Sequence, residues 1–96
     1  NGGTYQKYII KTTNYTLKKH DHIVYLSGAA LTASLPAAAT VDSIIYHIKN
    51  IHGDVTALIE PDGSETIEGI PTKVLGPADS TKIQSINNDR WVILGD

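Results

Sequence analysis

The alternation of apolar and polar residues along this chain of 96 residues predicts short β-strands throughout. The apolar runs are rich in Val, Ile, Thr and Tyr, which suit a pleated and half-buried surface. Glycine, proline, asparagine and aspartate separate these runs at short intervals, as turns do. We expect ten strands, at residues 8–12, 15–17, 22–26, 31–35, 44–50, 55–60, 66–68, 73–75, 81–87 and 90–94. Only residues 36–40, a proline followed by alanines, predict a single helical turn.

Strands this short, with no segment long enough for a crossover helix, indicate an all-β fold. We expect a small antiparallel sandwich or jelly-roll-like barrel with no substantial helix. The length predicts one domain over residues 1–96, in which residues 1–4 resemble a linker. The chain has no methionine and starts at Asn1, so we interpret it as a fragment of a longer chain rather than a processed product. No internal repeat is evident.

Several predicted strands are apolar on both faces, and this is the main physical clue to function. Residues 31–35 alternate as a strand with one wet face does, but Ile45 lies opposite Ile44 and Tyr46. A single small domain has too little chain to cover two apolar faces, so we expect a partner surface, most simply an identical subunit. The alternative is a loop that covers one face. The candidate interface residues are Tyr25, Ile44, Ile45, Trp91 and Val92.

Composition narrows the function further. The net charge is -2, and no basic run is longer than Lys18-Lys19, which argues against a nucleic-acid partner. No apolar stretch approaches the roughly 20 residues that a membrane span requires. There is no cysteine to cross-link a small core or to indicate a redox compartment, so oligomerisation is the remaining usual source of stability.

Catalytic and metal-binding motifs are weak. With no cysteine and no Gly-x-Ser-x-Gly, nucleophilic catalysis has no support, and we expect a protein that is not an enzyme. His20 and His22 share a strand face and could reach one metal ion, with His47 or His52 as a further ligand. Because no third ligand stands at a recognisable spacing, we favour surface roles for both and predict no metal site.

Two other groups of residues could bind ligands. Glu60, Asp62, Glu65 and Glu68 surround a Pro-Asp-Gly turn, but their spacing fits no calcium loop, so we favour a hairpin with solvated carboxylates. Lys18, Lys19 and Arg90 are candidates for an anion or nucleotide, within a wider set that includes Lys49 and Lys82. Tyrosines, Tyr5 among them, and Trp91 could stack on a base or a sugar, although the apolar neighbours of Trp91 favour the core.

Residues 34–38, 46–50, 55–59, 61–69 and 90–94 together resemble a short β module of phage tail spikes, tail fibres and other virion appendages. The resemblance covers roughly residues 8–95. Two positions depart from it. Ser43 stands where such modules often carry a glycine, and Asn88-Asp89 replaces the usual Asp-Gly before the tryptophan.

This resemblance implies a homotrimeric, non-enzymatic domain at the C-terminal tip of a tail appendage, made in the host cytoplasm and carried on the virion. Such domains act as intramolecular chaperones that register three chains, some of them removed by self-cleavage with a nucleotide involved, or as receptor-binding tips. We favour the assembly role, with the upstream domains of the parent spike as further partners. The alternative is a module that binds a ligand, either a cell-wall or host-surface carbohydrate or a nucleotide. The sequence does not identify a cofactor, and a nucleotide is the one candidate.

Overall fold

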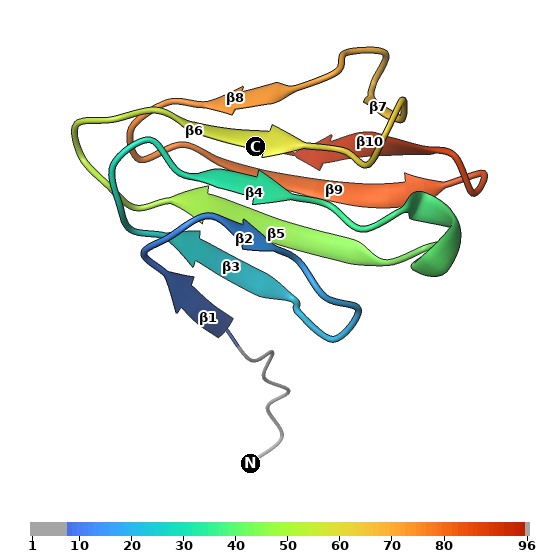
Figure 1. Cartoon of the computed structure of the whole chain (residues 1–96), viewed down its shortest axis with the longest axis horizontal. Coiled ribbons are helices and arrows are strands. Elements are labelled where there is room, and N and C mark those ends of the chain that lie inside the picture. The colour runs from blue at the N-terminus through green and yellow to red at the C-terminus, as the bar shows by residue number, and fades with distance from the viewer. Residues whose placement is uncertain (1–7, 96) are drawn as a thin grey trace.

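The computed structural model describes residues 8–95 and confirms an all-β sandwich of two facing sheets (Figure 1). The linker-like residues 1–4, Tyr5 and the terminal Asp96 lie outside the described residues. Each of the ten predicted strands is confirmed to within two residues of its bounds. They are β1 (Tyr8–Lys11), β2 (Tyr15–Thr16), β3 (Ile23–Leu26), β4 (Thr32–Ser34), β5 (Ile45–Asn50), β6 (Ala57–Glu60), β7 (Thr66–Ile67), β8 (Lys73–Leu75), β9 (Ser80–Ile86) and β10 (Arg90–Gly95). The predicted helical turn is a short 3-10 helix, η1 (Ala38–Thr40).

The strand order is β1-β3-β5-β9-β10-β7 in the six-stranded sheet and β2-β4-β6-β8 in the four-stranded sheet. Up to β6 the chain alternates between the sheets, so that β1, β3 and β5 pair in parallel, as do β2, β4 and β6. The sheets are therefore mixed, where the sequence led us to expect antiparallel pairing. The expectation failed because a strand in the opposite sheet replaces the crossover helix that parallel neighbours usually need.

These alternating strands form three stacked coils whose residues are in register. Ile9, Val24 and Ile48 occupy equivalent positions in the six-stranded sheet, and Ala33 and Ile59 do so in the four-stranded sheet. Val24, Ile48, Ala33 and Ile59 are fully buried between the sheets. The coils differ in length, which explains why this structural repeat leaves no period in the sequence.

The last four strands close the sandwich. β9 lies antiparallel between β5 and β10, and β7 pairs with β10 at the edge. Asn87 and Asn88 both adopt positive φ, at 56° and 58°. Two successive left-handed residues are typical of the type I′ turn that joins twisted hairpin strands, so these asparagines perform the task of an Asp-Gly pair.

The core is centred on Trp91 and Tyr46, whose ring centroids lie 5.7 Å apart in a stacked arrangement. Both side chains are fully buried. The Tyr46 hydroxyl donates a hydrogen bond to the carbonyl oxygen of Lys18 over 2.9 Å. Trp91 is therefore a core residue, which agrees with the packing that its apolar neighbours predicted.

Candidate interaction face

The outward side of the six-stranded sheet is the most distinctive surface of the described chain. Strand register brings a set of outward side chains from β1, β3, β5, β9 and β10 onto this side. We call it the open face. Its members are Tyr8, Ile10, Ile23, Tyr25, Ile45, His47, Lys49, Ser80, Lys82, Gln84, Ile86, Arg90 and Val92.

Apolar side chains cover the β1 and β3 side of the open face, and Ile45 adds another at the start of β5. Tyr8, Ile10 and Ile45 are 61%, 52% and 43% exposed, which is unusual for side chains of their size. Tyr25 is half-buried, and its ring centroid lies 5.6 Å from that of Tyr8. Ile23, the direct neighbour of Tyr8 on β3, is half-buried as well. The outer strands β1 and β3 therefore present a continuous apolar and aromatic surface.

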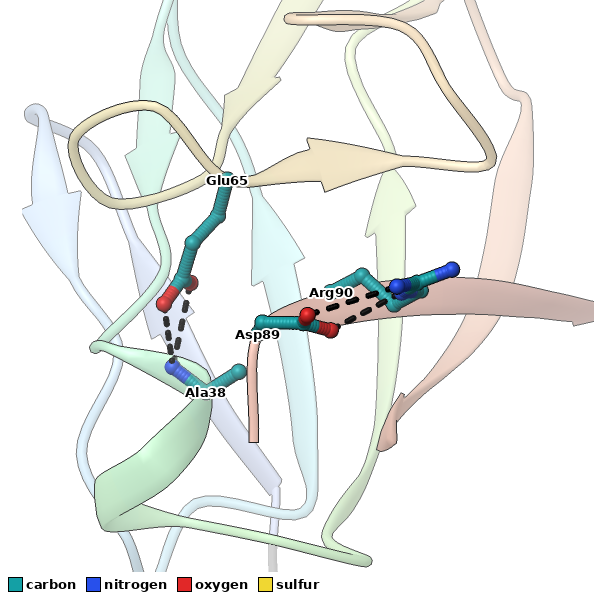
Figure 2. A network of polar contacts seen from close by, with 4 residues as sticks. All are labelled: Ala38, Glu65, Asp89 and Arg90. Carbon is teal, nitrogen blue, oxygen red and sulfur yellow. Dashed lines mark hydrogen bonds and ion pairs between the residues drawn. The ribbon is translucent and has the colours of Figure 1, made fainter. Parts of the chain in front are cut away.

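Two lysines and a histidine occupy the centre of the open face. Register places His47 opposite Lys82, and Lys49 opposite Ser80, on the neighbouring strands β5 and β9. No acidic residue is among the open-face members. The single ion pair within residues 8–95 joins Arg90 to its chain neighbour Asp89, with Nε 2.8 Å from Oδ1 (Figure 2). Lys49 and Lys82 thus have no carboxylate partner among the described residues.

Two shallow hollows adjoin each other at His47 on this face. One, of about 190 Å³, is lined by Ile23, Tyr25, His47, Ile48, Lys49 and Ser80. The other, of about 340 Å³, is lined by His22, Ser43, Ile44, Ile45, His47 and Lys82. Both combine apolar walls with lysine and histidine. A planar or apolar ligand that carries negative charge would suit this combination.

The predicted interface residues divide into two groups. Tyr25, Ile45 and Val92 lie on the open face, as the pattern of doubly apolar strands indicated. Trp91 is fully buried, and Ile44 is half-buried against the core, where its N–H donates to Ser85 Oγ over 3.2 Å. Trp91 is therefore wrong as an interface residue, because it points inward from β10 while Val92 points outward.

The predicted anion-binding trio is not brought together. Lys18 and Lys19 lie in the turn before β3, whereas Arg90 begins β10. β5 and β9 separate β3 from β10, so at the usual strand spacing the two locations are about 14 Å apart or more. Lys18 Nζ instead lies 5.1 Å from the centroid of the Tyr15 ring. Of the wider set of lysines, Lys49 and Lys82 are the pair that the fold assembles, and no signal in the sequence selects them because only the pairing of β5 with β9 makes them neighbours.

The histidines and acidic residues that the sequence offered as possible ligands do not form a metal site among the described residues. Within residues 8–95 no group of three or more His, Cys, Asp or Glu side chains is arranged to hold a metal ion. His22 contributes to the larger hollow, while His20 lies in the preceding turn. Glu65 accepts the N–H of Ala38 with both oxygens, at 3.0 and 3.1 Å (Figure 2), and Glu68 accepts the N–H of Ile93 over 2.9 Å. Two members of the acidic group therefore anchor loops and strands.

A polar cluster joins the two sheets at the first coil. The Tyr15 hydroxyl and the Lys18 N–H both donate to Asp21 Oδ2, over 2.7 and 2.8 Å. Burial, together with the hydrogen bond and the charge of Asp21, raises the pKa of Tyr15 to about 12. Burial and the same carboxylate, with a smaller contribution from Tyr15, raise the pKa of Tyr46 to about 12. Neither hydroxyl is poised to act as a base near neutral pH, which favours a structural role for this cluster.

Comparison with known proteins finds no family that matches the sequence, no similar curated protein and no similar solved structure. Within residues 8–95, the chain forms no helix with the length and apolar character that crossing a membrane would require.

Proposed function

We propose that this domain is a self-association module that holds three copies of its parent chain in register. The observation that carries the proposal is the open face, where the exposed Tyr8 and Ile10 lie beside the half-buried Tyr25, and where Ile45 is exposed on β5. Contiguous apolar surface of this kind on a soluble domain usually marks a binding surface. A domain of fewer than 100 residues also buries a smaller fraction of its surface than a larger domain does, and so benefits from a partner.

The number of copies and the biological setting rest on the resemblance to phage tail appendage modules. In that setting the domain is a homotrimeric assembly domain at the tip of a tail spike or fibre, present on the virion and made in the host cytoplasm. Registering three chains at one end would guide the upstream domains of the parent chain into alignment. The proposed role requires binding and no catalysis.

Sedimentation equilibrium at micromolar chain concentration tests the proposal. We expect a homotrimer for the native sequence. Ile45→Lys, which puts a charge onto the open face, should weaken association at least tenfold, or about 1.4 kcal/mol per interface. Val74→Lys is the matched control, since Val74 is 58% exposed on the four-stranded sheet, and it should leave association unchanged. A native chain that stays monomeric at these concentrations would contradict the proposal.

A second candidate function, ligand binding, is favoured by the two adjoining hollows. Tyr25 could stack on a sugar or base, and Lys49 and Lys82 could pair with an acidic group beside it. A glycan array and a thermal-shift series with nucleotides test this function, with Tyr25→Ala as the variant that should lose the signal. If the native chain gives no glycan signal and no nucleotide-dependent shift in melting temperature, ligand binding is excluded.

A further inference from the structure

The charge arrangement of the open face restricts how two copies can meet. His47, Lys49 and Lys82 lie in its centre, and its members include no carboxylate. If the open face packed against the open face of a second copy, the ammonium groups of Lys49 and Lys82 would face those of the other copy in a partly dehydrated contact. Like charges in such a contact oppose association, so this face fits a surface that supplies carboxylates.

The turn after β6 is such a surface. Glu60 ends β6 and Asp62 lies in the turn itself, and both side chains are exposed. No lysine or arginine occurs between residues 60 and 72. Glu65 and Glu68 already bind backbone N–H groups of their own chain, which leaves Glu60 and Asp62 as the outward carboxylates of this segment. β6 belongs to the four-stranded sheet, so its turn does not lie on the open face of its own copy (Figure 1).

We infer that the open face of one copy binds the Glu60–Asp62 turn of the next copy. The inference rests on the proposed self-association and adds the identity of the two contacting surfaces. A contact between two different surfaces is head-to-tail, and it closes into a ring if the rotation between copies allows. Three copies make the smallest such ring beyond a pair. Tyr8, Ile10 and Ile45 then flank the charge pairs and exclude water, while the charge pairs set the register of the chains.

Charge reversal tests the inference. We expect the double variant Lys49→Glu/Lys82→Glu to weaken trimer formation at least tenfold in sedimentation equilibrium, and Glu60→Lys/Asp62→Lys to do the same. The chain with all four substitutions should form trimers again, because each interface regains opposite charges. Circular dichroism checks that each variant keeps the native β-sheet spectrum, which we expect because none of the four side chains is buried.

The outcomes separate this inference from the proposed function. A native trimer that both double variants leave intact would overturn the inference and keep the self-association module. Loss of the trimer in both double variants without recovery in the fourfold variant would also overturn it, since charge pairing between these two surfaces predicts recovery. A native monomer would overturn both. Loss of the trimer in both double variants, followed by its return in the fourfold variant, is the result that supports the head-to-tail contact.

Discussion

The two sheets of this sandwich have equivalent inner faces and very different outer faces. On the outer side of the four-stranded sheet most side chains are polar, and the apolar ones are the half-buried Leu58 and the strongly exposed Val74. The open face of the six-stranded sheet instead exposes Tyr8 and Ile10 beside its central cations. Both sheets close the same core, so the fold does not require an apolar outer side. The proposed self-association would account for this difference.

The largest loss of stability should come from substitutions on the inner faces. Because the two inner faces are equivalent, the loss should be similar in both sheets. Ile48 in the six-stranded sheet and Ile59 in the four-stranded sheet are both fully buried. Ile48→Ala and Ile59→Ala should each lower the free energy of unfolding by about 2–5 kcal/mol, through lost burial and a residual cavity. Urea unfolding in an Ile45→Lys background, which minimises association, measures both. A cost confined to one sheet would show that the sheets do not share one core.

The next effect concerns the polar cluster that ties Tyr15 of the four-stranded sheet to Tyr46 of the six-stranded sheet. The pKa of each folded tyrosine is about 12, above the ordinary value of 10 for an unfolded chain. A pKa raised by folding means that stability is complete below pH 10 and is lost as pH rises toward 12. Urea unfolding from pH 8 to 11.5 should show this fall.

Two conservative variants serve as controls for that alkaline loss. Tyr46→Phe and Tyr15→Phe remove the titrating hydroxyls while keeping the rings, so each should flatten the fall in stability above pH 10. Tyr46→Phe should also cost about 1 kcal/mol at neutral pH, because the carbonyl of Lys18 loses its donor. An unchanged pH dependence in both variants would contradict the assignment of the alkaline transition to these tyrosines.

A smaller effect on stability is expected from removing the half-buried carboxylate of Glu65, and none from removing the exposed carboxylate of Asp89. Glu65 reaches from the loop after β6 to the N–H of Ala38 at the start of η1, as a capping residue does (Figure 2). Glu65→Ala should lower the free energy of unfolding by about 1 kcal/mol, the usual cost of losing a cap. Asp89→Ala breaks a fully exposed ion pair and should leave thermal unfolding unchanged. Equal effects of the two substitutions would refute this distinction.

The smallest effect lies at the entry to β5, beside the open face. Ser43 has a φ of 69°, in the left-handed region that favours glycine. Relief of about 1–2 kcal/mol of strain is partly offset by the entropy of a glycine in the unfolded chain, so Ser43→Gly should stabilise by about 0.5 kcal/mol. Ser43→Ala keeps the strain and is the control. Calorimetric melting temperatures should rise for the glycine variant alone.

Local chemistry explains why the strands could be located from sequence while their partners could not. The turn residues at 61–63 and 87–89 mark strand ends wherever they occur, because they act through their own backbone geometry. Pairing depends on contacts between residues far apart in the chain. Tyr8 meets Ile23 and Ile23 meets His47, and coils of unequal length leave no period from which these neighbours could be inferred.

The candidate site shows the same limit. Strand alternation was sufficient to show that neighbours such as Trp91 and Val92 point to opposite sides of their strand, since the side chains of a strand alternate with a period of two. It could not tell which of Trp91 and Val92 is buried, because both are apolar and only tertiary packing determines which side of the strand faces the core. Nor could it select Lys49 and Lys82 from the scattered lysines, which become neighbours solely through the pairing of β5 with β9.

The amino-acid sequence by itself therefore determined an all-β chain, the position of each strand, the single helical turn and the presence of strands with two apolar sides. These properties follow from backbone preferences and side-chain periodicity, which act over a few residues. Only the tertiary structure decided that the first six strands form parallel coils, which face of each doubly apolar strand is buried, and that Lys49 and Lys82 gather at the centre of the open face. Those properties depend on which distant segments share a sheet, a choice set by burying both inner faces at once.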